Sequence, residues 1–251
     1  MSQSLVNETA GARTPLSGLV AALITLVVVA FFTGLLRHLP QPVLAAVVLV
    51  AVTGLVQVEA LRHIWRFSRT EFAVAMAALV GVLGSGLLNG VLLGVALSIV
   101  LLIHRASRPR VVEIGRVPGT SYFADLVRHP ENERVRDVLI ARSEGALLYF
   151  NVDHVRDQLT DLLRARSVAP ALLIFFMGNV PYVDLAGARL LADLRVTLLE
   201  RGIEFRPAEA HGIVREALRR LGSPHAAALA EAHQTVDDAL SRWQATTRPA
   251  A

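Results

Sequence analysis

Three long stretches without a charged side chain dominate the first 103 residues. They cover 15–36, 39–58 and 72–103 and are 22, 20 and 32 residues long. About 20 apolar residues cross a bilayer core of roughly 30 Å as a helix. Each of the first two stretches therefore predicts one membrane span, because a soluble protein with these runs would lack a polar face for water.

The third stretch is too long for one span, since 32 residues form a helix of roughly 48 Å. Its middle reads GVLGSGLLNG. The small residues predict a tight turn between two closely packed helices. The sequence thus predicts four spans, at about 15–36, 39–58, 70–86 and 88–105.

Charge is divided unevenly between the two halves. Residues 1–110 carry eight Arg against three acidic residues, 8 − 3 = +5, and residues 111–251 carry 17 − 18 = −1. The positive charge accompanies the apolar half, which favours a membrane protein over a nucleic-acid binder. The arginines in 59–71 and after Ile103 place both segments on the cytoplasmic side.

The basic segment LRHIWRFSRTE (61–71) also contains Leu61, Ile64 and Trp65. Two interpretations remain open. The segment either lies along the cytoplasmic membrane interface or is an ordinary inside loop anchored by Trp65.

From residue 111 onward, the pattern is that of a small α/β domain. Residues 138–150 predict two short strands around Glu144 and Gly145. The apolar run between Pro170 and Gly178 predicts a strand covered on both faces. Helix patterns in 152–166 and 184–202, and a C-terminal helix near 235–246, complete a βαβα alternation.

No enzyme motif stands out. The chain has no cysteine, which excludes thiol catalysis and Cys-ligated metals. The eight histidines have no metal-ligand spacing, and nucleotide-binding loops and nucleophile elbows are absent from the sequence. We therefore expect no enzyme activity, no cofactor and no metal.

Several segments resemble the SulP (sulfate permease) anion transporters, in the order in which that family has them. SQSLVNETAGARTPLSGL is similar to the family's S-R-S-x-V-N and A-G-A-[KR]-T segments. LPQPVLAAVVLVAVTGLV, WRFSRTEFAVA and HRASRPRVVEIGRVPGTSYFADLVRHPENE resemble the stretches that follow. Residues 138–245 resemble its STAS domain, the fold of bacterial anti-sigma-factor antagonists.

The resemblance implies a fold of fourteen helices in two inverted repeats. This chain matches the C-terminal part: a half-helix at 2–12, four transmembrane helices, and a cytoplasmic STAS domain at 111–251. Residues 1–110 would form a partial transport domain whose N-terminal helices are missing. A half-helix leaves unsatisfied N–H groups and a positive dipole end in the membrane, where an anion can bind.

By the same resemblance, Ser2, Gln3 and Ser4 are the candidate substrate-binding residues. Ser2 and Ser4 match serines of the family's anion site, although they also suit a simple helix cap. Gln3 stands where the family commonly has Arg, which predicts weaker anion binding or altered coupling.

The anti-sigma-factor antagonists carry a phosphorylated serine in a D-S-[ST]-G turn. Here the turn reads Asp184, Leu185, Ala186, Gly187, without a hydroxyl. The resemblance therefore excludes phosphorylation by that route. Asp184 and Gly187 keep two roles open, a structural one at the start of a helix and a contact with a partner or nucleotide.

The function that the resemblance implies is transport of sulfate-like anions, bicarbonate or dicarboxylates by a secondary transporter. The chain alone would lack half the site and be inactive. The alternative is a membrane-anchored STAS protein with a regulatory role and no transport. Expected partners are a small anion, the lipid bilayer, and a second copy or the missing N-terminal half, in the bacterial inner (plasma) membrane.

Overall fold

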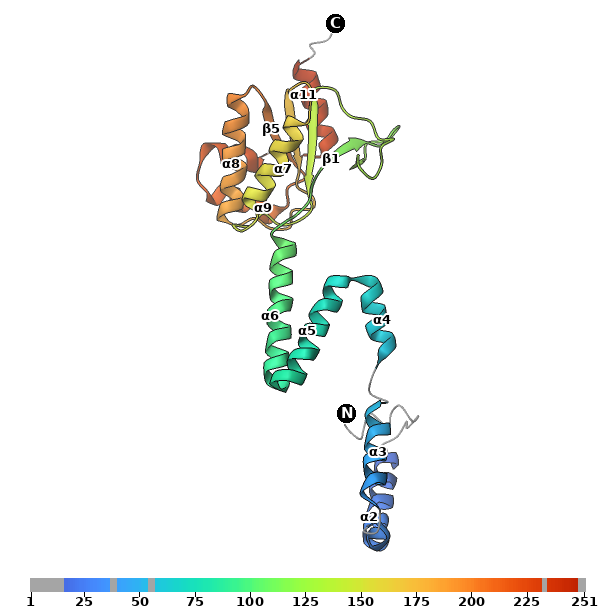
Figure 1. Ribbon diagram of the computed structural model, residues 1–251. Helices are drawn as coiled ribbons and strands as arrows, with labels where there is room; N and C mark the ends of the chain where they lie inside the picture. The colour runs from blue at the N-terminus through green and yellow to red at the C-terminus, as the bar shows by residue number, and fades with distance from the viewer. Residues whose placement is uncertain (1–15, 37–39, 54–56, 232–233, 248–251) are drawn as a thin grey trace. The chain divides into compact units, whose positions relative to one another are not determined.

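The computed structural model describes residues 16–36, 40–53, 57–231 and 234–247 (Figure 1). The chain divides into two compact units, Met1–Met76 and Ala77–Ala251. The expected half-helix at 2–12 lies outside the described residues.

The first unit is helical, and its first two described helices are apolar. It contains α2 (Leu16–Leu36), α3 (Gln41–Thr53), α4 (Val58–Phe67) and the beginning of α5 (Arg69–Ser85). Large side chains of α2 such as Leu19 are exposed, and no residue of α3 is buried against the described part of the chain. Apolar surface of this extent needs a covering that the described residues do not supply.

The second unit begins with a helical hairpin. The third uncharged stretch is split, as predicted: α5 ends at Ser85 and α6 (Leu87–Ala106) begins two residues later. Gly86 makes the turn with φ = 89°, a conformation that favours glycine. Gly90 is buried in the hairpin, and a Cβ there would lie 2.3 Å from the backbone nitrogen of Val82.

Two described segments are long and apolar enough to cross a membrane, Gln41–Phe67 and Leu87–Ala106. The first of these runs across residues 54–56, which are outside the described ranges. The part of α2 from Leu16 to Phe31 is also apolar but shorter. The four spans stay a prediction from the sequence.

The expected α/β domain is confirmed. Its five-stranded sheet has the order β2-β1-β3-β4-β5, in which β3, β4 and β5 are parallel and β1 is antiparallel to both β2 and β3. The strands are β1 (Val111–Arg116), β2 (Phe123–Asp125), β3 (Val138–Ser143), β4 (Leu172–Phe176) and β5 (Glu204–Ala208). The helices are α7 (Val152–Arg164), α8 (Leu185–Glu200), α9 (Gly212–Arg220), α10 (Pro224–Glu231) and α11 (Val236–Thr247).

One expectation was wrong. Residues 138–150 form only β3, and the second half of the predicted hairpin is not a strand. Leu147 instead makes an isolated parallel bridge to Val183. Leu147 is buried although it lies in a loop. A short apolar pattern alone cannot distinguish such a buried loop from a strand.

The two faces of the sheet carry separate cores, as the apolar run of β4 predicts. Leu173 and Phe175 point into a cluster covered by α7, α8, α9 and α10. Leu172 and Ile174 point to the other face, which α11 covers with Val236, Ala239 and Leu240 (Figure 1). All four β4 residues are buried, so this strand belongs to the sheet interior.

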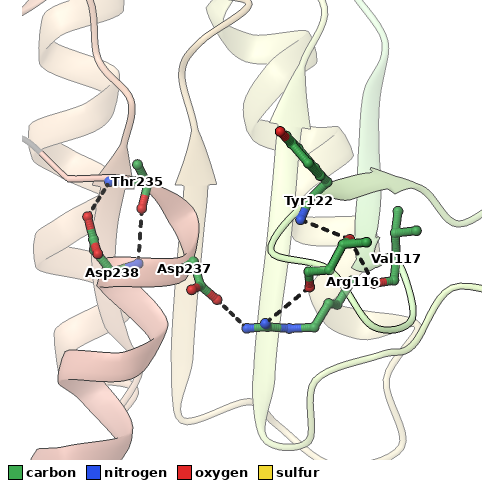
Figure 2. Close-up of polar contacts among 7 residues, drawn as sticks. Arg116, Val117, Tyr122, Thr235, Asp237 and Asp238 are labelled. Carbon is green, nitrogen blue, oxygen red and sulfur yellow. Dashed lines mark hydrogen bonds and ion pairs between the residues drawn. The ribbon is translucent and has the colours of Figure 1, made fainter.

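An ion pair fixes the start of α11 to β1, and a reciprocal cap closes the first turn of the helix. Arg116 of β1 forms an ion pair with Asp237, and Figure 2 shows its guanidinium reaching from the sheet to the helix. Thr235 and Asp238 cap α11 reciprocally: the Thr235 hydroxyl accepts from the Asp238 N–H at 3.1 Å, and the Asp238 carboxylate accepts from the Thr235 N–H at 3.4 Å.

Candidate functional site

The structure places only part of the predicted site. Ser2, Gln3 and Ser4 lie outside the described residues. Asp184 and Gly187 lie where the loop after β4 enters α8, at the carboxyl end of a parallel strand. This end of a parallel sheet is where ligands and partners commonly bind in α/β folds.

Asp184 connects two loops through one carboxylate. It is the N-cap of α8, and its Oδ1 accepts a hydrogen bond from the Gly187 N–H at 2.9 Å. Its Oδ2 accepts from the Tyr149 N–H at 2.8 Å, and its own N–H donates to the Leu147 carbonyl at 3.2 Å. The side chain therefore closes the first turn of α8 and holds the loop after β3.

Gly187 lies directly against that same loop. A Cβ at this position would stand 2.4 Å from the carbonyl oxygen and 2.9 Å from the Cβ of Leu147. Leu147 is itself fixed, because its N–H donates to the Tyr182 carbonyl at 3.1 Å. The absence of a side chain at 187 is what allows α8 to pack this closely.

Asn151 ties this loop to the end of α6. The side chain is buried, and its Nδ2 donates to the carbonyls of Ala106 and Ala146, both at 3.0 Å. Its Oδ1 accepts from the Leu148 N–H at 2.9 Å. Ala106 is the last residue of α6. The only local sequence signal at Asn151 is its place directly before α7.

The surface around Asp184 is apolar and aromatic. Tyr149 is 74% exposed, Leu185 58% and Tyr182 48%. Tyr149 also packs edge-to-face on Phe150 with the ring centroids 5.3 Å apart. Exposed aromatic residues are enriched where proteins contact one another. The partner-contact role of Asp184 and Gly187 therefore remains open beside their structural one.

Elsewhere in the described residues, no group of three or more His, Asp or Glu side chains could hold a metal ion. A pocket of about 340 Å³ lies at the amino ends of β3 and β4 and is lined by Glu113, Arg134 and Arg166. Arg166 forms an ion pair with Glu113, and the Arg134 Nε lies 3.4 Å from the same carboxylate. Asp137 lines the pocket as well, so two guanidinium groups face two carboxylates and no net positive charge is left for an anion.

Replacing Asp184 with alanine should lower the free energy of unfolding of the α/β domain by about 2 kcal/mol, because a helix cap and a second hydrogen bond are lost. The measurement is a urea titration of the whole chain in detergent micelles, followed by the emission of Trp243. Trp243 packs against the core beneath α11, and Trp65→Phe removes the other tryptophan.

The matched control is Asp161→Ala, which removes an Asp that is 69% exposed on α7 and lies 3.9 Å from Arg164. Its effect should stay within about 0.5 kcal/mol. Equal midpoints for the two variants would show that Asp184 does not stabilise the domain.

Two family models match the chain. The model of the sulfate permease family matches residues 1–78, and that of the STAS domain matches residues 129–239. The first match covers the apolar helices of the first unit. The second covers β3, β4 and β5, helices α7 to α10, and only the start of α11.

Curated relatives are sulfate transporters from plants. High affinity sulfate transporter 2 of Stylosanthes hamata is 30% identical over 238 residues, which is 92% of this chain and 35% of that protein. Probable sulfate transporter 4.2 of Arabidopsis thaliana is 30% identical over 88% of this chain and 34% of its own length. The chain thus spans about a third of the length of these relatives.

Among solved structures, the murine solute carrier 26 family member A9 anion transporter in the inward-facing state matches with a TM-score of 0.76. The match covers 98% of this chain and 40% of that one at 21% identity. At this level of sequence identity, the match shows a similar fold.

Proposed function

Because the chain belongs to the sulfate permease family and carries that family's STAS domain, we propose that it forms the C-terminal part of an anion transporter. The observation that carries this proposal is the order of the two matches within one chain, 1–78 followed by 129–239. The relatives are named for sulfate, and sulfate-like anions, bicarbonate and dicarboxylates are the proposed substrate class.

The proposed binding residues are Ser2, Gln3 and Ser4. Hydroxyl and amide groups at the start of a half-helix donate hydrogen bonds to an anion without adding a net charge. The positive end of the helix dipole adds to this attraction. Gln3 supplies a donor but no positive charge, so we propose that this site binds its anion more weakly than one with Arg at that position.

The 251-residue chain does not transport by itself under this proposal. Alternating access needs one group of helices to move against another around a central site, and the chain spans about a third of its relatives. The proposed location is a plasma membrane with the STAS domain in the cytoplasm. A bacterial membrane and a dimer, or assembly with an N-terminal half, remain predictions.

Uptake of radiolabelled sulfate into proteoliposomes tests this proposal. The chain alone should give the flux of protein-free vesicles. A chimera in which residues 1–251 replace the matching third of High affinity sulfate transporter 2 should give saturable uptake. Ser2→Ala with Ser4→Ala in that chimera should reduce uptake at least about tenfold, since hydrogen bonds to a charged group contribute about 1.5–3 kcal/mol each.

Size-exclusion chromatography shows whether the chimera is folded and monodisperse. A folded chimera that moves neither sulfate nor bicarbonate nor a dicarboxylate would contradict the transport function. Saturable uptake by the chain alone would contradict the claim that it supplies only part of a site.

A second candidate function is a membrane-anchored STAS protein that acts through a partner. The exposed side chains of Tyr149, Tyr182 and Leu185 around the Asp184 turn favour it. A pull-down with residues 111–251 and with the Tyr149→Ser variant separates the two functions. A bound protein that is not a transporter, and that the variant loses, supports this second function.

A further inference from the structure

The helix α4 is divided lengthwise into a charged and an apolar side. At 3.6 residues per turn, its four ionisable residues fall within an arc of about 100°. They are Glu59, Arg62, His63 and Arg66. The remaining arc carries the apolar residues Val58, Ala60, Leu61, Ile64, Trp65 and Phe67. Such a division over ten residues is typical of a helix that lies at a boundary between water and an apolar phase.

A single residue separates α4 from α5, and it fixes a corner. Ser68 is extended, with φ = −151° and ψ = 109°, and its N–H donates to the Ile64 carbonyl at 2.8 Å. Its hydroxyl accepts from the Glu71 N–H at 3.2 Å. The same residue thus ends one helix and caps the next, so α4 does not continue the axis of α5.

Aromatic contacts hold this corner. The ring of Trp65 meets that of Phe72 edge-on, with the centroids 4.8 Å apart. The guanidinium of Arg69 lies over the Trp65 ring, 5.6 Å from its centroid. These contacts combine an apolar anchor, an indole and a cation at one level, the combination that favours a membrane–water interface.

The positive charges of the α4 arginines are not neutralised by an ion pair within the described part of the chain. Arg62 and Arg66 are exposed and form no ion pair with any other residue in the described part of the chain. They stand one helical turn apart on the same side. Guanidinium groups bind phosphate through two parallel hydrogen bonds.

Inclusion of α4 in a membrane span is the main alternative, because Gln41–Phe67 is apolar enough on average. A helix of its 27 residues would be roughly 40 Å long, beyond the core of about 30 Å. Two arginines in the hydrocarbon are also strongly unfavourable. The backbone and the arginines of α4 therefore lie outside the hydrocarbon core.

We propose that α4 lies in the plane of the cytoplasmic membrane surface and binds the phosphate groups of anionic glycerophospholipids through Arg62 and Arg66. Trp65 and Ile64 insert among the upper acyl chains, and the corner at Ser68 directs α5 into the bilayer. The inference concerns a lipid site and does not depend on the chain's transport activity.

Depth-dependent quenching tests the position of α4. The whole chain with Trp243→Phe keeps Trp65 as its one tryptophan and is reconstituted with phosphatidylcholines brominated at shallow, middle or deep acyl positions. The shallow bromines should quench Trp65 most. Strongest quenching by the deep bromines would place α4 in a span, and quenching by aqueous acrylamide but by no bromolipid would make it a free loop; either result overturns the proposal.

Energy transfer from Trp65 to dansyl-labelled lipids tests the headgroup. Transfer to phosphatidylglycerol should exceed transfer to phosphatidylcholine, and Arg62→Gln with Arg66→Gln should reduce this preference on the order of tenfold. Arg219→Gln with Arg220→Gln, two exposed arginines of α9, is the matched control and should leave it unchanged. Equal transfer to both lipids, or no change in the α4 variant, would overturn the proposed lipid site.

Discussion

Replacing Gly187 with valine should lower the free energy of unfolding of the STAS domain by about 3 kcal/mol or more. An added Cβ would stand 2.4 Å from the Leu147 carbonyl oxygen, closer than any van der Waals contact allows. Neither side can yield easily, because the Leu147 carbonyl also accepts from the Asp184 N–H. Overpacking a tight site costs about 1–3 kcal/mol, and contact with backbone brings it to the upper end.

The measurement is again urea unfolding of the whole chain, followed by Trp243 in the Trp65→Phe background. Gly212→Val is the matched control, because Gly212 begins α9 and an added Cβ there meets nothing within 4 Å. Its unfolding midpoint should match that of the parent. If Gly187→Val behaved like the control, α8 would not pack on Leu147 as described.

Replacing Gly90 with valine should separate α5 from α6. A Cβ at 90 would lie 2.3 Å from the Val82 nitrogen and 2.5 Å from its Cα. The hairpin has no room to adjust nearby, since a Cβ at Gly94 would lie 2.9 Å from that of Ala78. Small residues let membrane helices approach closely, and a branched side chain between two backbones removes that contact.

Disulfide cross-linking reports this packing directly in a chain without cysteine. A Cβ at Gly81 would lie 4.0 Å from the Leu93 Cβ, within the range of a disulfide. Gly81→Cys with Leu93→Cys should therefore cross-link on oxidation. Adding Gly90→Val should slow this about tenfold, as expected for about 1–3 kcal/mol of overpacking.

Gly84→Val is the control within the same hairpin, because an added Cβ at 84 meets nothing within 4 Å of the described chain. It should leave the cross-linking rate unchanged. Equal rates in the Gly90 and Gly84 variants would show that the two helices do not pack through Gly90.

Much of the fold follows from patterns that are local in the sequence. The split at Gly86 could be predicted because one helix of 32 residues is too long for a bilayer. The burial of β4 on both faces could be predicted from its unbroken apolar run. The prediction of a hairpin around Gly145 was wrong, because Leu147 lies in a loop and is buried against the segment at Val183.

The candidate site also contains features that the sequence predicts and features that it does not. Asp184 could be predicted as a helix cap from its position, but its second hydrogen bond goes to Tyr149, 35 residues earlier. Asn151 could not be found, because its partner Ala106 is 45 residues away. Ser2, Gln3 and Ser4 lie outside the described residues, and their predicted roles rest on the family resemblance.

The apolar segments, the change of net charge from positive to negative near residue 110, and the family resemblance can all be read from the order of residues alone. These properties follow from composition and period, which residues carry without reference to distant partners. The three-dimensional fold was needed to show that the loop after β3 contacts Asp184, Gly187 and the end of α6, and that α4 turns away from α5 at Ser68. Such contacts depend on which distant backbones meet, and no local pattern encodes that.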